Sequence, residues 1–354
     1  MTNKKLNIAL IGAGGIGKVW AAAFAKTPEV HPHTTTKSSQ ESKDSSFGVG
    51  VNLVCVADVD LVRAKELAKG FGAKTCGDWK DVLKDKNIDA VVIGTPHNLL
   101  APISYAALSA GKHVLVEKPA GINSKEIQKN ITLAKKNKLV YMIGFNHRYH
   151  AAFQMARKIF EAGEIGKSTF VRARYGFGGR PGYEKEWRFN KKISGGGELI
   201  DQGVHMIDMA RWFLGDFKDV KGFAESYLWK SGVEDNGFAM LRTKDKKVAS
   251  IHVSWTNWKW VHSFELYGED GYLIVDGLDQ RYVGPERLTI GKRDPEFKAP
   301  PEEQVVIFDK EQKEDSFARE LQELAAAVSE KRQPLTSGED ALEVLKVVEK
   351  IYKQ

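Results

Sequence analysis

Three features at the start of the chain restrict the fold more than any others: an apolar run, a glycine-rich turn and a helical pattern of apolar residues. Leu6–Ile11 is typical of a buried strand, and residues 12–17 (GAGGIG) follow it directly. In this arrangement Gly12 forms a tight turn, Gly14 lets a pyrophosphate approach the backbone, and Gly17 allows the helix to pack closely on the strand. The free N–H groups at the helix start would face the phosphates. The segment predicts a Rossmann-type dinucleotide site, although a glycine-rich turn in another α/β protein would look similar.

The second strand ends at an acidic residue suited to the adenosine ribose. Residues 51–57 form an apolar run that leads into Asp58, and a carboxylate at this point accepts hydrogen bonds from ribose hydroxyls. Its charge would repel a 2′-phosphate, so we expect NAD rather than NADP; a plain turn residue is the alternative. Between glycines and acid lies a Ser-, Thr- and Lys-rich tract, residues 31–50, which we expect to be a flexible surface insertion.

Strands and helices alternate over the next hundred residues. Strand patterns occur at residues 90–93, 113–116 and 140–144, and helical patterns at 63–71, 78–83 and 102–110. This alternation predicts a parallel sheet, which binds its ligand at the carboxyl ends of the strands. Thr95-Pro96 and Glu117-Lys118 fall at such ends. We therefore expect the dinucleotide to contact Gly12, Gly14, Gly15, Ile16, Gly17, Asp58, Thr95, Pro96, Asn98, Glu117 and Lys118.

A carboxylate and an imidazole lie four positions apart in the middle of the chain. Asp201 and His205 follow three glycines, residues 195–197, and their spacing predicts that both side chains lie on one face of a helix. The glycines would let backbone and substrate come close. Such a pair could bind a hydroxyl group and remove its proton. An ordinary Asp–His contact on a helix is the alternative, and the spacing alone does not separate the two.

The second half of the chain is rich in β pattern. Short runs separated by turns predict an antiparallel sheet, at residues 168–174, 220–229, 237–242, 247–257, 263–268 and 271–275. Helices over residues 314–331 and 338–352 are expected to close the chain. We expect two domains: residues 1–145 for the dinucleotide, and residues 146–354 for the substrate and for oligomerisation.

The composition excludes several classes of protein. Two cysteines in 354 residues argue against a disulfide scaffold and suit a reducing compartment. Because we find neither an apolar run of membrane-spanning length nor a signal peptide, we expect a cytoplasmic protein without a membrane partner. The net charge of +7 suits an anionic substrate or merely a lysine-rich surface, and without a basic stripe we expect no nucleic acid partner. His31 and His33 have no further ligand nearby, so no metal is expected.

The motifs resemble those of the Gfo/Idh/MocA oxidoreductases, the family of glucose–fructose oxidoreductase and inositol dehydrogenase. The resemblance covers nearly the whole chain, and rests on residues 11–17, 57–58, 95–96, 110–119 (AGKHVLVEKP), 144–149 (GFNHRY), 163–166 and the glycines 195–197 with Asp201, His205 and Asp208. It implies an α/β fold: an N-terminal Rossmann parallel sheet, then an α+β domain with a large, open, mainly antiparallel sheet. The exposed face of that sheet would make the subunit contacts of a homodimer or homotetramer.

The same resemblance implies roles for individual residues. Lys118 would be the catalytic lysine, joined to Pro119 by a cis bond. Substrate contacts are expected from Asn146, Arg148, Asp201 and His205. Independently of the resemblance, the aromatic and cationic residues of the loop over residues 180–189, Trp187 among them, would suit a sugar ring or a phosphate and could set specificity; a packed surface loop explains them equally well. One position departs from the pattern: family members often carry a histidine where this chain has Leu100, and the polar residues nearby are His97 and Asn98.

We expect reversible hydride transfer between NAD and a ring hydroxyl of a sugar or cyclitol, with nucleotide sugars included as substrates. Lys118 and His205 would remove the hydroxyl proton as a coupled pair, in which either could be the formal base. Asp201 would hold an adjacent hydroxyl and orient His205. Two alternatives remain: an NAD-assisted glycosidase would use the same residues, and a non-catalytic dinucleotide-sensing regulator typically lacks the lysine or the histidine.

Overall fold

A computed structural model describes residues 5–27, 50–278, 284–300, 302–309 and 315–354. The first sheet is parallel, with strand order β3-β2-β1-β4-β5-β6. Its strands are β1 (Leu6–Ile11), β2 (Val51–Ala57), β3 (Lys74–Cys76), β4 (Ala90–Ile93), β5 (His113–Glu117) and β6 (Tyr141–Gly144). The connecting helices are α1 (Gly15–Lys26), α2 (Leu61–Ala68), α3 (Trp79–Lys84), α4 (His97–Ser109) and α5 (Ser124–Asn137). β1 lies between β2 and β4. Strands β2 and β3 are added on one side of β1 and strands β4, β5 and β6 on the other, and in such parallel sheets a ligand binds in the crevice where the order changes.

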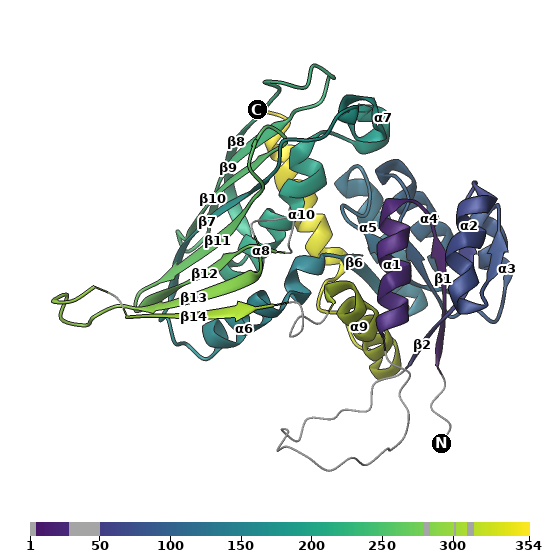
Figure 1. The fold of residues 1–354 in the computed structure, drawn as a ribbon, viewed down its shortest axis with the longest axis horizontal. Helices are drawn as coiled ribbons and strands as arrows, with labels where there is room; N and C mark the ends of the chain where they lie inside the picture. Colours follow the sequence, from purple (N-terminus) through teal and green to yellow (C-terminus); the bar gives the residue numbers. More distant parts are fainter. Residues whose placement is uncertain (1–4, 28–49, 279–283, 301, 310–314) are drawn as a thin grey trace, which may run out of the picture.

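The second sheet has eight strands in the order β14-β13-β12-β11-β7-β10-β9-β8. They are β7 (Ser168–Gly176), β8 (Phe217–Glu225), β9 (Asn236–Thr243), β10 (Val248–Ser254), β11 (Val261–Gly268), β12 (Gly271–Asp276), β13 (Glu286–Lys292) and β14 (Glu302–Phe308). All neighbours are antiparallel except β7 and β10. Helices α6 (Ala151–Glu161), α8 (Val204–Leu214) and α10 (Gly338–Ile351) pack on one face of it (Figure 1). The expected fold class is confirmed.

The last two helices connect the two halves of the molecule. α9 (Ser316–Glu330) packs against α1, and its Leu321 and Leu324 share a core cluster with Leu10 and Trp20 of the parallel sheet. α10 packs against both α5 and β8. The C-terminal segment therefore completes the core of the N-terminal sheet as well as its own, and the division at residue 145 remains a prediction.

Several expected boundaries are wrong, among them the start of α4 and the end of β8. α4 begins at His97 and not at residue 102, so Pro102 lies inside the helix, where it lacks one backbone donor. β8 ends at Glu225 and not at residue 229, because the Asp235 carboxylate accepts the next backbone N–H groups, those of residues 227–229.

Two further expectations concern the insertion after the first helix and the absence of a membrane-spanning helix. The insertion expected at residues 31–50 lies, apart from Gly50, outside the described residues. Across the described ranges, no helix has the length and apolar character needed to cross a bilayer.

Candidate functional site

The glycine-rich turn after β1 has the geometry that a pyrophosphate requires. Gly12 has a φ of +104°, and a Cβ there would lie 2.5 Å from the Gly94 carbonyl oxygen. A Cβ on Gly17 would lie 2.2 Å from the Gly12 oxygen, so the close packing of α1 on the turn requires glycine. Gly14 and Gly15, in contrast, have open space around the position of a Cβ. Because packing does not require these two glycines, their surface is free for a phosphate at the start of α1.

The remaining expected cofactor residues lie at the carboxyl ends of neighbouring strands. The Asp58 carboxylate, after β2, accepts the backbone N–H of Ala13 at 2.6 Å and so lies against the glycine turn. After β4, the hydroxyl of Thr95 is buried and has no hydrogen-bond partner among the described residues. Pro96 is the N-cap residue of α4, and Asn98 lies half-buried in its first turn. The Thr95 hydroxyl is thus free for a ligand, whereas both Asp58 oxygens already accept backbone N–H groups, the second from Asp60 at 2.8 Å.

Glu117 ends β5 as a buried carboxyl group with a defined partner. Its Oε1 accepts a hydrogen bond of 2.9 Å from the Trp20 indole. Burial raises the pKa of Glu117 to about 7, although Lys118 and Trp20 oppose the shift. This carboxyl group therefore titrates near neutral pH. It is followed in the chain by Lys118.

Lys118 joins the two halves of the site through Asp201. The Lys118–Pro119 bond is cis, as the family resemblance implied. The Lys118 ammonium donates to the Asp201 carboxylate at 2.8 Å and to its backbone oxygen at 2.6 Å. Arg188 donates to the other carboxylate oxygen at 2.9 Å, and His97 Nε2 lies 3.6 Å from the first. Burial alone would raise the pKa of Asp201, but Lys118 and Arg188 hold it well below its usual range, so Asp201 is a carboxylate at neutral pH.

The expected contact between Asp201 and His205 is not found among the described residues. Asp201 lies in a π-helical turn, Leu199–Gly203, and His205 lies in the first turn of α8. The wider turn changes the angle between the two positions, so four-residue spacing no longer stacks their side chains. Instead, the His205 ring lies parallel to that of His147, with ring centroids 4.0 Å apart and an interplanar angle of 11°.

Ring contacts hold His205 in place. Phe145 and Tyr175 contact it edge-on at centroid distances of 6.1 and 6.4 Å, and its Nδ1 is buried without a hydrogen-bond partner among the described residues. Burial, reinforced by the charge of Lys118, lowers the pKa of His205 well below its usual range. His205 is therefore neutral at pH 7.

The three glycines before Asp201 serve the packing of the protein itself. Gly195 has a φ of +85°, and a Cβ on Gly197 would lie 1.8 Å from the Glu234 backbone oxygen. The Glu234 carboxylate in turn accepts the N–H groups of Gly197 and Leu199, at 2.8 and 3.1 Å. These glycines let the backbone at Glu234 reach the π turn, which confirms the expected close approach of backbone; an approach of substrate there stays a prediction.

Two other residues expected to bind substrate, Arg148 and Asn146, contact protein groups. The Arg148 guanidinium is buried and donates to Asp208 (2.8 and 2.5 Å), Asp340 (3.1 Å) and the Leu335 backbone oxygen (2.9 Å). Its donors are used by this ion-pair network, so we correct its expected role from substrate binding to structure. Asn146 is half-buried, with its amide 3.5 Å from the Ser316 hydroxyl.

The loop over residues 180–189 lies at the site, as a pair of short 3₁₀ turns. Trp187 packs edge-on against His97 with ring centroids 4.7 Å apart, and the Arg188 guanidinium lies 4.6 Å from the centre of the Trp187 ring. A buried aromatic cluster of Tyr183, Phe189 and Trp255 supports the loop from behind. The loop therefore holds one cation and one aromatic surface beside Asp201.

Three residues that lie beside Asp201 or His205 were not expected as site residues: His97, Arg188 and His147. His97 places an imidazole near Asp201, and its Nδ1 lies 2.9 Å from the Ser194 oxygen; burial lowers its pKa. Leu100, where relatives often have a histidine, is fully buried. The aromatic and cationic composition of residues 183–189 was a signal for Arg188, whereas a signal for the His147–His205 stacking is absent from the sequence.

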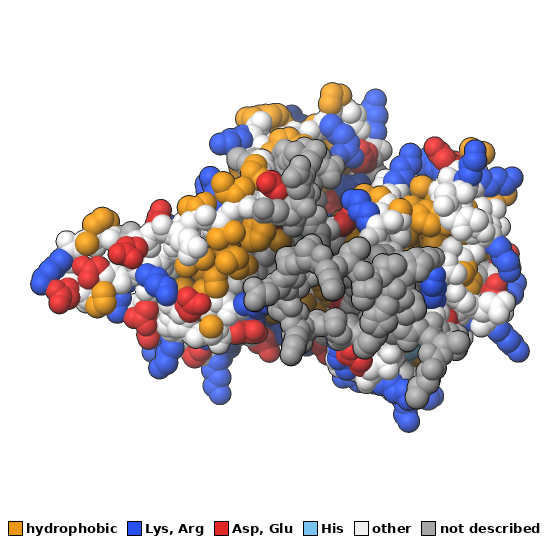
Figure 2. Space-filling model, turned by 60° about the horizontal axis from the view of Figure 1, so that its bottom comes forward, with side chains coloured by type: hydrophobic (Ala, Val, Ile, Leu, Met, Phe, Trp, Pro, Cys, Tyr) orange, Lys and Arg blue, Asp and Glu red, His pale blue; other side chains and the backbone are white. Residues whose placement is uncertain are grey.

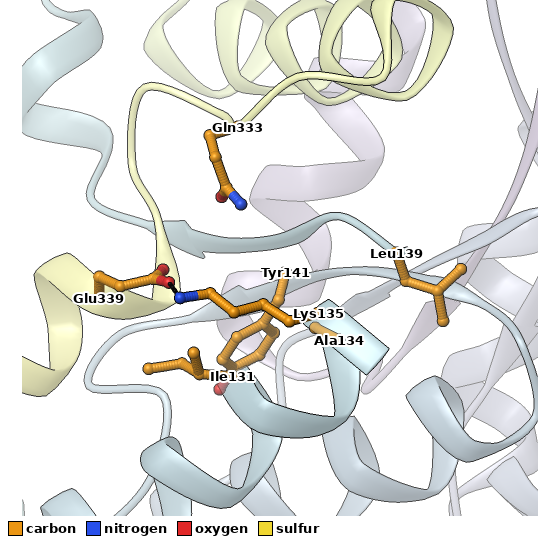
Figure 3. A pocket seen from close by; sticks show the side chains of 7 residues that line it. All are labelled: Ile131, Ala134, Lys135, Leu139, Tyr141, Gln333 and Glu339. Carbon is orange, nitrogen blue, oxygen red and sulfur yellow. Dashed lines mark ion pairs between the residues drawn. The ribbon is translucent and has the colours of Figure 1, made fainter. Parts of the chain in front are cut away.

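A small cavity elsewhere has no connection with this chemistry. It lies between α5, β6 and the segment before α10, beside the Lys135–Glu339 ion pair of 2.6 Å and the Tyr141 ring (Figure 3). Its volume of about 10 Å³ suits at most one water molecule. In the part of the chain that the structure describes, no group of three or more His, Cys, Asp or Glu side chains is arranged to hold a metal ion.

Comparison with known proteins agrees with this geometry. Residues 6–145 match the model of an oxidoreductase family with an NAD-binding Rossmann fold, and residues 153–274 match the GFO/IDH/MocA C-terminal domain. The chain belongs to the Gfo/Idh/MocA family. Its N-terminal sheet is therefore an NAD-binding Rossmann unit, and the open glycine turn described above is the part that fits the dinucleotide.

Characterised members of the family are similar over most of this chain. Levoglucosan dehydrogenase of Pseudarthrobacter phenanthrenivorans is 31% identical over 68% of this chain and 59% of its own length. Myo-inositol 2-dehydrogenase of Thermotoga maritima is 26% identical over 81% and 84%. A structure of levoglucosan dehydrogenase in complex with NADH superposes with a TM-score of 0.85 at 25% identity, covering 99% of this chain and 98% of the other.

Proposed function

We propose that this protein is an NAD-dependent dehydrogenase that oxidises a ring hydroxyl of a sugar or cyclitol, or reduces the corresponding ketone. The observation that carries this proposal is the Lys118–Asp201 pair, which joins the cofactor edge of the Rossmann sheet to the π turn beside His205. Relatives named as levoglucosan and inositol dehydrogenases support the substrate class.

The residues divide the chemistry as follows. NAD, when bound, supplies the hydride acceptor. The Lys118 ammonium, held by Asp201 at 2.8 Å, donates a hydrogen bond to the reacting hydroxyl oxygen and stabilises the negative charge that develops there. Burial keeps His205 neutral, and in this proposal its free ring nitrogen accepts the hydroxyl proton. As the proton leaves the oxygen, the C–H bond gives up its hydride and a ketone forms; reduction follows the same steps in reverse.

Asp201 and Arg188 bind the rest of the sugar in this proposal. The Asp201 carboxylate accepts from Lys118 on one oxygen and from Arg188 on the other and so fixes both cations, whose remaining N–H groups would donate to substrate hydroxyls. Trp187 supplies an aromatic face beside them. Paired donors and acceptors next to an aromatic ring suit the alternating hydroxyl and C–H surfaces of a pyranose or inositol ring.

The test is a screen for NAD reduction with levoglucosan, inositols, simple aldoses and nucleotide sugars. We expect saturable NADH formation with at least one sugar or cyclitol, and none from a Lys118→Ala protein. Release of free NADH separates this function from an NAD-assisted glycosidase, which would cleave an aryl glycoside while NAD stays catalytic. A chain that binds NAD but turns over no substrate of either kind would instead be a regulator, and the retention of both Lys118 and His205 argues against that outcome.

We further propose a preference for NAD over NADP, a cytoplasmic location and a homo-oligomeric state. The charge of Asp58, which lies against the glycine turn, disfavours a 2′-phosphate. Two free cysteines suit a reducing compartment. The uncovered face of the large sheet exposes Phe170, Phe223 and Met240, with Val305 and Ile307 on its edge strand, and hydrophobic side chains are visible on the half of the molecule that carries this sheet (Figure 2).

A further inference from the structure

The only two cysteines of the chain meet on neighbouring strands of the parallel sheet. Cys55 lies on β2 and Cys76 at the end of β3, and their sulfur atoms are 3.0 Å apart. Both side chains point to the sheet face that packs against Val82 of α3, since both belong to or contact the same core cluster. They lie on the cofactor half of the molecule but have no role in the chemistry proposed above.

The two sulfur atoms differ in accessibility. Cys55 is 4% exposed, whereas Cys76 is half-buried and reachable at the sheet edge. Burial, followed by the contact with Cys76, raises the pKa of Cys55 to about 12. An oxidant therefore reaches Cys76 first, and Cys55 reacts only after Cys76 has changed. Cys55 pairs with Lys74 and Cys76 with Ala57, so the two cysteines are diagonal neighbours, two residues out of register. A disulfide needs a sulfur–sulfur distance of ~2 Å, and from a diagonal position this requires a shift of the β3 backbone relative to β2 as well as side-chain rotation.

The pair is linked by backbone hydrogen bonds to the cofactor site. The Asp58 N–H donates to the Cys76 oxygen at 3.2 Å, and the Asp58 carboxylate accepts the Ala13 N–H of the glycine turn. The Gly12 N–H donates to the Ala57 oxygen at 2.8 Å. A bond that draws β3 towards β2 thus moves the carbonyl on which Asp58 is anchored, one hydrogen bond away from the pyrophosphate turn.

We propose that Cys55 and Cys76 form a reversible oxidation site, in which an intramolecular disulfide between β2 and β3 weakens dinucleotide binding at Asp58. The coupling to affinity rests on the proposed role of Asp58, whereas formation of the disulfide does not. Reversible disulfides in a reducing compartment generally serve redox sensing, and a single pair next to the cofactor site is suited to this use.

The oxidant is a small disulfide such as oxidised glutathione, and the reaction balances in two exchanges. The Cys76 thiolate attacks one glutathione sulfur, forms a mixed disulfide and releases one glutathione thiolate. Modified Cys76 no longer carries an ionisable thiol, which removes one cause of the raised pKa of Cys55. The Cys55 sulfur then attacks the Cys76 sulfur of the mixed disulfide, and its proton passes to the second glutathione, which leaves as a thiol. Two protein thiols are oxidised, and one glutathione disulfide is reduced to two thiols.

The test treats the full-length protein with oxidised glutathione and follows its mass. Wild type is expected to lose two hydrogen atoms without retaining glutathione, and to regain them with dithiothreitol. Cys55→Ser should stop at a glutathione adduct on Cys76, and Cys76→Ser should stay unmodified under the same conditions. Wild type that keeps a stable adduct, or that does not react, overturns the proposed disulfide.

The second measurement is NADH affinity by fluorescence, in the reduced and oxidised forms. We expect the dissociation constant of wild type to rise roughly 5-fold or more on oxidation, and that of Cys76→Ser to be the same before and after treatment. An unchanged affinity of the oxidised wild type overturns the coupling. Because the measurement uses binding and not turnover, it stays valid if the sugar dehydrogenase function fails its own screen.

Discussion

At the scale of single residues, the centre of the site is the Asp201 carboxylate, which two neighbouring cations keep ionised. Asp201 is buried, yet Lys118 and Arg188 each occupy one of its oxygens. A lone buried carboxylate would instead take up a proton. Burial keeps His205 neutral, so an uncharged ring nitrogen is present in the same site as the Lys118 cation, which can stabilise the negative charge that develops on a hydroxyl oxygen.

The first prediction removes these two groups one at a time. Lys118→Ala and His205→Ala should each lower turnover roughly 10²-fold or more, the usual scale for losing a general acid–base group. The double variant should be only slightly worse than the worse single variant, since both act on one proton transfer. Steady-state kinetics on the four proteins check this, with NADH affinity measured alongside.

His205→Ala should leave the NADH affinity unchanged, because His205 lies on α8 of the second half of the chain. Near-normal turnover by this variant on the true substrate would show that His205 is a structural residue and would contradict the proposed mechanism.

The second prediction concerns Glu117 and the pH dependence of stability. Its folded-state pKa of about 7 lies above the ordinary value of 4.5, so protonation favours the folded state. This stability is fully present below pH 4.5 and is lost as the pH rises through 7, with a difference of about 3 kcal/mol by linkage. Glu117→Gln removes the titration. Melting temperature should therefore fall less between pH 5.5 and 8.5 in the variant than in wild type.

Other buried carboxyl groups with raised pKa values, such as Asp208 at about 6, titrate in both proteins and cancel in this comparison. Parallel pH curves of the two melting temperatures would show that Glu117 is ionised in the folded protein throughout the range.

At the scale of elements, different glycines of the turn after β1 serve folding and binding: packing requires Gly17, and open space surrounds Gly14. Gly17→Ala should destabilise the protein by roughly 1–3 kcal/mol, since its Cβ would lie 2.2 Å from a backbone oxygen. Gly14→Ala should fold normally, because open space surrounds its Cβ, but should lose most of its NADH affinity, because the methyl group occupies the surface that the pyrophosphate approaches. Thermal melts and NADH titrations distinguish the two effects, and normal NADH binding by Gly14→Ala would place the pyrophosphate elsewhere.

The elements that sequence patterns predicted are those with one buried face or with fixed end signals. β1 and β2 have the bounds expected from their apolar runs. β14 was missed because all its side chains are exposed or half-buried, so its sequence carries no alternation between apolar and polar residues. β13 was missed although one of its faces is buried. β3 was missed because it has only three residues.

The site was predictable where residues adjacent in sequence act together. Lys118 and Asp201 carry local motifs, and the structure joins them across 83 positions. The contacts of Arg188 and His147 depend on how two loops fold over the sheets, which no local pattern encodes. The π turn changed the expected Asp201–His205 contact for a related reason: one extra residue in a helical turn leaves no reliable signature in the sequence.

At the scale of the whole molecule, the two sheets use their faces differently. The parallel sheet is covered by helices on both faces, with α9 returning from the far end of the chain to complete one of them. The large sheet has α6, α8 and α10 packed on one face, and its other face carries exposed apolar side chains. On the parts of the face in Figure 2 that are not grey, lysine and arginine side chains are interspersed with acidic ones.

The last prediction assigns the uncovered face of the large sheet to a second copy of the chain. Phe223 on β8 and Met240 on β9 are 69% and 52% exposed on neighbouring strands, and monomeric proteins rarely expose large contiguous apolar patches. Phe223→Glu with Met240→Glu would bury two charges in such an interface, at a cost that unmodified contacts could not offset. Light scattering should then show a molar mass reduced to that of one chain. The control Val62→Glu, at an exposed apolar position on α2 of the other half, should leave the mass of the oligomer unchanged. A monomeric wild type, or a double variant that stays oligomeric, would contradict the assignment of this face.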